Sequence, residues 1–381
     1  RMFHFIPKFV REAVSGLPPV KRIVSTLLAD MGLPDSVTMF MNYPTRYDNR
    51  DTERALKGSG IKCPELENYA PVIWDYWERN LDPDLFVDHS LEGNVGGKVV
   101  LITGASSGIG KTSALRLAEA GAHVLLVARS AEKLEETAAE IATVGGVATI
   151  YQADVSDLAD CDRLVAEVLE NHGFIDILLN NAGRSIRRSL ELSYDRFHDF
   201  ERTMQINYFG AIRLTMGLLP SMAERGTGHI INMSSISALT PSPRFSAYVA
   251  SKSALDAWTR AAAVEYSDLN VRFTTINMPL VRTPMIEATS VYDSMPVLTP
   301  DEAGDMVVEA VIKKPKRIAS PLGVYLQVMT AVAPKFTEVV MNVVFRMFND
   351  SAAARGDKKV EKVEASNEQV ALAALMKGVH F

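Results

Sequence analysis

The stretch Thr103-Gly104-Ala105-Ser106-Ser107-Gly108-Ile109-Gly110 decides the fold of this chain. It follows an apolar run, Val99 to Thr103, and opens a segment with helical spacing, Gly108 to Glu119. A glycine-rich turn between a strand and a helix is typical of dinucleotide-binding domains, because it lets the backbone approach a pyrophosphate. The free N–H groups at the start of the helix favour the phosphates. The predicted cofactor contacts from this turn are Gly104, Ser106, Ser107, Gly108, Ile109 and Gly110.

The same strand–helix unit repeats along the chain. Runs that are apolar throughout, rather than alternating, indicate a parallel sheet covered on both faces. The further predicted strands are His123 to Ala128, Ala148 to Gln152, Ile175 to Leu179, His229 to Met233, Val271 to Asn277 and a short Lys316 to Ser320. We therefore expect a Rossmann-like, doubly wound α/β domain over residues 98–320. Its ligand should lie beyond the carboxyl ends of the strands.

The segments on either side of this domain have a different character. Residues 1–97 combine short helical segments with a polar linker, and are predicted to be a helical cap or the tail of a missing upstream domain. Residues 321–381 open with an apolar, Met-rich helical stretch broken at Pro334 and end in a polar tail. Core or dimer packing is the first interpretation of that stretch. The alternatives are a substrate wall shared with Met285 and Met295, and a helix lying on a membrane surface.

Composition restricts the class of protein. The chain has 381 residues, of which 47% are hydrophobic and 23% charged, as in soluble globular proteins. A net charge of −6 argues against a nucleic-acid partner. Two cysteines and seven scattered histidines suggest neither a disulfide framework nor a metal site, and they favour a reducing cytosol. No apolar run reaches the ~18 residues of a membrane-spanning helix. We expect a cytoplasmic homo-oligomer, with contact to a membrane surface as an alternative.

Residues at the ends of the predicted strands supply further cofactor candidates. Ala128 stands where an acidic residue would select NAD, and the adjacent Arg129 suits a 2′-phosphate, so NADP is favoured. A plain surface arginine is the alternative. Asp154 is predicted either at the adenine edge or as the cap of the next helix. The residues predicted to line the cofactor trough after the fourth strand are Asn181, Ala182 and Gly183.

A tyrosine and a lysine, Tyr248 and Lys252, are four residues apart and therefore share one face of a predicted helix. An ammonium at that place would favour the phenolate and lower the tyrosine pKa towards working pH, as general acid/base chemistry requires. Ser235 ends the fifth predicted strand, thirteen residues before Tyr248, and brings a hydroxyl to the same edge of the sheet. On its own, the Tyr–Lys spacing could also mark a solvated helix face.

Together these motifs resemble the short-chain dehydrogenase/reductase family over roughly Lys98 to Pro284. Five signals occur in the family's order: T-G-x-x-x-G-x-G, N-N-A-G, the asparagine of Q-I-N-Y, the serine and Y-x-x-x-K. The resemblance implies that Tyr248 protonates a carbonyl oxygen and that Ser235 hydrogen-bonds the same oxygen. It also implies that Lys252 lowers the pKa of Tyr248 and holds the nicotinamide ribose. Asn207 would hold a water in a proton relay.

The turn after the sixth predicted strand departs from the family pattern, because leucine follows Pro279 where the family has glycine. The predicted cofactor contacts from this turn are Pro279, Val281 and Thr283, with Thr283 placed for the carboxamide.

A narrower resemblance concerns the substrate. The run Pro279 to Met285 and the apolar extension resemble the carboxyl-terminal reductase domain of bacterial two-domain fatty acyl-CoA reductases. Ile61 to Pro64 and Trp74 to Pro83 resemble the end of the preceding domain. This resemblance implies an NADPH-dependent reduction of a long-chain fatty aldehyde to a fatty alcohol. The alternatives are a 3-oxoacyl or hydroxysteroid reductase, and an interaction protein on an inactive reductase scaffold.

Overall fold

The computed structural model describes residues 48–62, 64–80, 88–286, 297–347, 350 and 352–355. The chain divides into two units, residues 1–86 and Val87–Phe381. The first unit contains helices α4 (Arg50–Leu56) and α5 (Leu66–Asn80), which bury none of their residues. The predictions made for residues 1–47, Cys63, Met295 and the tail after residue 355 lie outside the described ranges. The domain boundary at residues 97 and 98 stays a prediction.

The second unit is built on seven parallel strands in the order β3-β2-β1-β4-β5-β6-β7. Their bounds are β1 (Val99–Thr103), β2 (His123–Ala128), β3 (Val147–Gln152), β4 (Ile177–Asn180), β5 (Gly228–Ser235), β6 (Val271–Met278) and β7 (Arg317–Ala319). The strand order reverses between β1 and β4. Doubly wound sheets bind their ligands beyond the carboxyl ends of the strands at such a point.

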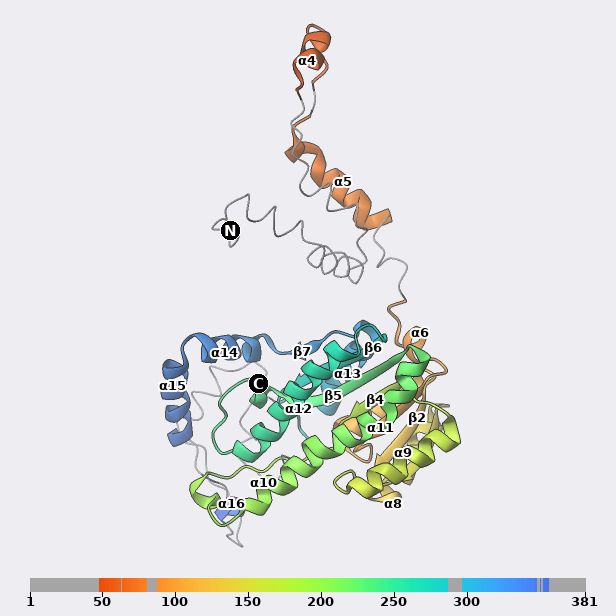
Figure 1. Cartoon of the computed structure of the whole chain (residues 1–381), viewed down its shortest axis with the longest axis vertical. Helices are drawn as coiled ribbons and strands as arrows, with labels where there is room; N and C mark the ends of the chain where they lie inside the picture. Colours follow the sequence, from red (N-terminus) through yellow and green to blue (C-terminus); the bar gives the residue numbers. More distant parts are fainter. Residues whose placement is uncertain are drawn as a thin grey trace, which may run out of the picture. The chain divides into compact units, whose positions relative to one another are not determined.

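Helices cover both faces of this sheet (Figure 1). One face carries α7 (Gly108–Glu119), α8 (Ala131–Thr143) and α13 (Pro300–Lys313), and the other carries α9 (Leu158–His172), α11 (Gly210–Arg225) and α12 (Ser246–Glu265). Alternation along β1 divides the apolar side chains between two cores: Val100 and Ile102 join the first, and Leu101 joins the second. The predicted Rossmann-like, doubly wound architecture is confirmed, and every predicted strand lies within two residues of its observed bounds.

The other described helical segments of this unit are α6 (Leu91–Val95), η2 (Glu191–Ser193), α10 (Phe197–Met204), η3 (Gln205–Phe209), η4 (Ile236–Ala238), α14 (Pro321–Val332), α15 (Pro334–Met347) and α16 (Ala352–Arg355). The predicted break at Pro334 is confirmed, because α14 ends just before it. A row of large apolar side chains on α14 and α15 is exposed: Val324, Tyr325, Val328, Val332, Phe336, Val339, Val340 and Val343. No described helix is both long and apolar enough to cross a membrane.

The buried His229 on β5 makes the free energy of unfolding depend on pH. Its side chain is buried, its Nε2 lies 2.8 Å from the Thr274 hydroxyl, and its Nδ1 has no partner among the described residues. Burial, aided by the positive charges of Lys314 and Lys98, lowers its pKa to about 3. Below the ordinary pKa the unfolded chain binds a proton that the folded chain does not, so stability falls on acidification between pH 6.5 and about 3.

We expect His229→Gln to remove this dependence. Between pH 6 and pH 5, urea denaturation should show that the unfolding free energy of the wild type falls by about 1.4 kcal/mol more than that of the variant. The matched control is His89→Gln at an exposed histidine, which should follow the wild type. Parallel curves for the wild type and His229→Gln would contradict the prediction.

Candidate active site

A cavity of about 790 Å³ lies at the carboxyl ends of the strands, where the strand order reverses. It is lined by most of the residues predicted from the sequence: Gly104, Ser106, Ser107, Gly108, Ile109, Arg129, Asp154, Asn181, Ala182, Gly183, Ser235, Tyr248, Lys252, Pro279, Val281 and Thr283. The two other predicted residues, Gly110 and Asn207, are buried and do not line it. The strand–turn–helix units therefore bring residues more than 170 positions apart to one edge of the sheet.

The turn after β1 requires its glycines. Gly104 and Gly108 have positive φ angles of 68° and 53°. A Cβ atom on Gly104 would lie 3.0 Å from the Cα of Ala182, and one on Gly110 only 2.3 Å from the carbonyl oxygen of Gly104. Ser107 precedes α7, and its side chain makes no capping hydrogen bond with the described backbone. The first N–H groups of the helix therefore point free of a side-chain acceptor, which fits the phosphates of a dinucleotide.

Hydrogen bonds tie the end of β4 to the end of β1. The Thr103 hydroxyl accepts from the backbone N–H groups of Asn181 and Ala182, each at 3.0 Å. The Asn181 side-chain amide donates to the Thr103 carbonyl at 2.9 Å. These bonds thus tie the segment that follows β4 to the end of β1.

Arg129 and Asp154 lie at the ends of β2 and β3. The Arg129 side chain is exposed and lines the cavity, and no hydrogen bond or ion pair of its guanidinium occurs among the described residues. The Asp154 carboxylate accepts from the backbone and the hydroxyl of Ser156, at 2.9 and 2.7 Å. The alternative that Asp154 caps the next helix is wrong, because Asp157 occupies that position and accepts from the first turn of α9.

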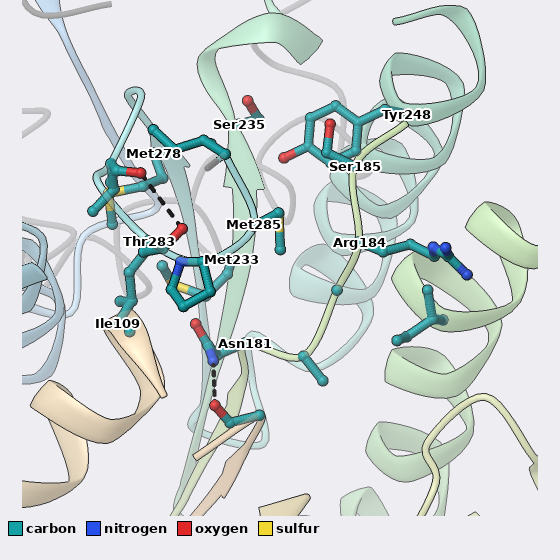
Figure 2. Close-up of a pocket in the computed structure, with 18 of the residues that line it drawn as sticks. Ile109, Asn181, Arg184, Ser185, Met233, Ser235, Tyr248, Met278, Thr283 and Met285 are labelled. Carbon is teal, nitrogen blue, oxygen red and sulfur yellow. Dashed lines mark hydrogen bonds between the residues drawn. The ribbon is translucent and has the colours of Figure 1, made fainter. Parts of the chain in front are cut away.

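Tyr248 on α12 and Ser235 at the end of β5 both face the cavity (Figure 2). The Ser235 hydroxyl oxygen accepts from the N–H and the hydroxyl of Ser237, at 3.2 and 2.9 Å. Burial raises the pKa of Tyr248 above its ordinary value, while a hydrogen bond with Ser235 acts in the opposite direction. The sequence had predicted a pKa lowered by Lys252. This prediction is wrong: the pKa of Tyr248 is raised, because desolvation of the phenolate is the largest effect.

Lys252 is buried with an exposed fraction of 4%, and its Nζ donates to the Met233 carbonyl at 2.6 Å. Burial lowers its pKa to about 8, and the nearby carboxylate of Asp256 opposes this shift. Asp256 lies one turn further along α12, is itself buried, and accepts from the Asn277 amide at 3.0 Å. Sequence reasoning missed Asp256, although its spacing of four residues from Lys252 places both on one helix face.

Asn207 fixes the backbone next to Lys252. It lies in the π-helical turn η3, where Gly210 N–H bonds to the carbonyl of Gln205. Its amide accepts from Arg184 N–H at 2.9 Å and donates to the Arg184 carbonyl, also at 2.9 Å. A third bond runs to the Ser251 hydroxyl at 2.9 Å. The amide therefore clamps the chain after the N-N-A-G motif, while the water-holding role stays a prediction.

Backbone hydrogen bonds join the turn after β6 to Leu298, just before α13. Leu298 N–H donates to the Leu280 carbonyl at 2.8 Å, and Arg282 N–H donates to the Leu298 carbonyl at the same distance. The methyl of Thr283 occupies the space beside Gly108, 3.0 Å from where a Cβ would stand. Met285 lines the cavity, but no described residue of α14 or α15 does. The described part of those helices therefore does not form the substrate wall considered as an alternative.

The family model for short chain dehydrogenases matches residues 98–291. The chain belongs to this family. It is an oxidoreductase, and its glycine turn and open helix N-terminus fit the nicotinamide dinucleotide that short-chain dehydrogenases use.

Within this family, the chain is similar to several fatty acyl-CoA reductases and to a reductase solved with NADP. A fatty acyl-CoA reductase of Acinetobacter baylyi is 51% identical over 288 residues, which cover 76% of this chain and 96% of the relative. A fatty acyl-CoA reductase of Mycobacterium tuberculosis is 44% identical over 64% of this chain and 84% of its own. A metagenomic short-chain oxidoreductase solved in complex with NADP has a TM-score of 0.52 at 29% identity, covering 59% of this chain and 97% of that one. The predicted relationship to fatty acyl-CoA reductases is confirmed.

Proposed function

We propose that this chain is an NADPH-dependent reductase of the carbonyl group of long-chain fatty acyl substrates. The observation that carries the proposal is a cavity that joins Tyr248, Ser235 and Lys252 to a glycine-rich dinucleotide turn. It occurs in a chain 51% identical to a fatty acyl-CoA reductase over nearly the whole of that protein.

The side chains have complementary roles at the carbonyl oxygen. NADPH, when bound, supplies the hydride for the carbonyl carbon. Tyr248 keeps its proton at neutral pH, because its pKa is raised, and gives that proton to the oxygen. Ser235 accepts two hydrogen bonds from Ser237, so its own O–H remains the donor, and it can serve the same oxygen when a substrate is bound. Lys252 holds an ammonium beside Gly183, where the ribose of the cofactor would pass.

The simplest reaction of this site reduces a fatty aldehyde to a fatty alcohol. Hydride adds to the carbonyl carbon and the Tyr248 proton adds to the oxygen, so no leaving group is required. A second candidate is the reduction of the acyl-CoA thioester to the aldehyde, with loss of the thiol. The Acinetobacter relative favours this second reaction, because 96% of a protein named for acyl-CoA reduction aligns with this chain.

Oxidation of NADPH, followed by its absorbance, tests the proposal. Dodecanal and dodecanoyl-CoA are compared with an acetoacetyl thioester and a ketosteroid. Turnover of either dodecyl substrate supports a fatty acyl carbonyl reductase, and product analysis assigns the step. Turnover of only the ketone substrates would replace the proposal with one of the family alternatives, and no turnover with any of them would support an inactive scaffold.

Arg129 should select the phosphate of the cofactor. We expect Arg129→Gln to weaken NADPH binding by about tenfold or more, because a charge-assisted contact with the 2′-phosphate is lost, and to change NADH binding by less than about twofold. Fluorescence titration of both dinucleotides measures this. The control is Arg213→Gln, at an exposed arginine on α11 that pairs with Asp162 on α9. An equal loss for NADPH and NADH would remove the argument for NADP.

The predicted homo-oligomer, the cytoplasmic location and the contact with a membrane surface stay proposals. The exposed apolar side chains of α14 and α15 support either of the two surface interactions.

A further inference from the structure

Arg244 has a strained backbone close to the reacting tyrosine. Its φ is 68°, in the left-handed region that residues other than glycine rarely adopt. It comes four residues before Tyr248, and its neighbours Ser242 and Phe245 line the cavity. Strain of this kind persists only where surrounding contacts impose it, and it is concentrated at functional sites. The contacts that hold Arg244 in this conformation therefore bear on the function of the cavity.

The Arg244 side chain packs against the end of α15 and against Asp350, which follows that helix. It is only 7% exposed. The guanidinium carbon lies 4.0 Å from the centroid of the Phe345 ring, and Nη1 donates to the Phe345 carbonyl at 2.9 Å. The Nε atom lies 3.3 Å from Oδ1 of Asp350, whose side chain is also largely buried. One side chain thus fixes the C-terminal part of the chain at two points, by stacking, a hydrogen bond and an ion pair.

The segment that follows β4 is joined to the same residues. The Arg188 N–H donates to the Arg244 carbonyl at 2.7 Å, and the Ser189 N–H donates to Oδ1 of Asp350 at 3.0 Å. Burial acts to raise the pKa of Asp350, but hydrogen bonds from Ser189 and the charge of Arg244 hold it below its ordinary value, so the carboxylate is ionised at neutral pH. Arg244, Ser189, Phe345 and Asp350 form the Arg244 cluster. It joins three segments of the chain that are distant in sequence.

The Arg244 cluster places α16 at the cavity. Ala354 on α16 comes four residues after Asp350 and lines the cavity. The Arg355 guanidinium donates to the Asp350 carbonyl at 3.0 Å, which links α16 to the cluster. Among the described residues that follow Ile286, Ala354 is the only one in the lining. This part of the cavity wall therefore depends on the contacts of Arg244.

The wall at Ala354 lies away from the phosphate end of the cofactor trough. Figure 1 draws α15 and α16 on one side of the unit and α8, which follows Arg129, on the other. The ring of Phe245, beside Arg244, lies 6.4 Å from that of Tyr248 between centroids and extends an apolar surface from the reacting residue. The other apolar side chains of the lining outside the glycine turn include Ile186, Ile236 and Met285. An apolar lining of this kind suits a hydrocarbon chain.

We infer that Arg244 is a positioning residue: through Phe345 and Asp350 it holds Ala354 as a wall against which the distal part of a long acyl chain packs. The inference rests on the proposed function and deepens it, because it names the residue that makes the site favour long chains. A short aldehyde occupies only the space beside Tyr248 and Ser235, so it gains nothing from this wall.

The test compares dodecanal with butanal in steady-state oxidation of NADPH. Arg244→Gly removes the side chain and suits the positive φ. Asp350→Asn removes the charge and keeps an oxygen for the Ser189 N–H. Each variant should lower kcat/KM for dodecanal by about tenfold through KM, the effect of exposing about two methylene groups to water, and should change kcat/KM for butanal by less than about twofold.

Two matched controls lie away from the cavity. Asn270→Gly changes another exposed residue with a positive φ, 54°, and Asp162→Asn changes an exposed carboxylate that pairs with Arg213. Both controls should act on the two aldehydes like the wild type. A purely structural role of Arg244 would lower kcat for both aldehydes alike, so equal losses would overturn the inference. Unchanged kinetics in Arg244→Gly and Asp350→Asn would overturn it as well.

A binding measurement separates this inference from the proposed function, because it needs no turnover. Decan-1-ol is titrated calorimetrically into protein saturated with NADP⁺, and both cluster variants should bind it about tenfold more weakly than the wild type. A wild type that reduces neither dodecyl substrate, yet binds decan-1-ol more tightly than the variants, would refute the proposed function and leave the role of Arg244 standing. Equal affinities in the wild type and the variants would overturn that role, whatever the turnover.

Discussion

Replacing Tyr248 with phenylalanine should lower kcat for the fatty acyl substrate by about a thousandfold, while NADPH still binds with nearly unchanged affinity. The ring stays in the cavity, so packing on α12 is preserved and only the hydroxyl is lost. That hydroxyl is the one group in the described lining that combines contact with Ser235 and a raised pKa, and thus holds a proton to donate at neutral pH. Stopped-flow or steady-state oxidation of NADPH measures kcat, and fluorescence titration measures the dissociation constant.

The control for this variant is Tyr194→Phe, at a tyrosine that is 85% exposed and distant in sequence from α12. It should keep the rate of the wild type. Retention of most of the activity in Tyr248→Phe would show that the proton comes from elsewhere, and the mechanism would then have to be abandoned. A loss of NADPH binding equal to the loss of rate would instead mean that the hydroxyl acts mainly on the cofactor.

The fold could be predicted because its signals are local. The glycines between Val99–Thr103 and Gly108–Glu119 are required by backbone angles and close contacts within a single turn. The buried strands appear in the sequence as uninterrupted apolar runs, because both of their faces are covered. These features depend on neighbours in sequence and on the parallel sheet, so the printed sequence contains them.

The electrostatics of the site could not be predicted in the same way. A Tyr–Lys spacing shows that two side chains share a helix face, but the pKa of Tyr248 depends on how far the fold excludes water from it. Asp199 pairs with both Arg188 and Arg196, and the sequence does not show that two arginines share this carboxylate. Such competition for a single carboxylate is a property of three-dimensional packing. The same holds for the cap of α9, which is Asp157 and not Asp154.

Lys252 and Asp256 lie one turn apart on α12, and each affects the pKa of the other. The ammonium is buried, and its carboxylate partner on the next turn of α12 is also held by Asn277. Burial raises the pKa of Asp256, and Lys252 is among the groups that lower it. Removing the ammonium therefore affects both the proposed contact with the cofactor ribose and a buried carboxylate that loses a nearby opposite charge.

We expect Lys252→Met to lower kcat by about a hundredfold, the usual effect of removing one preorganised cationic donor, and to weaken NADPH binding as well. The variant should also change the response of stability to alkali. The pKa of Lys252 is about 8 in the folded chain against 10.5 as the ordinary value, so between these pH values the unfolded wild type binds the extra proton. The contribution of Lys252 to stability should thus rise with pH across that window, by up to about 1.4 kcal/mol per pH unit, and it is measured as the difference between the wild type and the variant. Lys252→Met lacks this rise, whereas Lys313→Met, at an exposed lysine on α13, should retain both the rise and the full rate. Urea denaturation from pH 8 to pH 10 distinguishes them, and a Lys252→Met curve that climbs like the wild type would show that this lysine is not the buried cation that the structure describes.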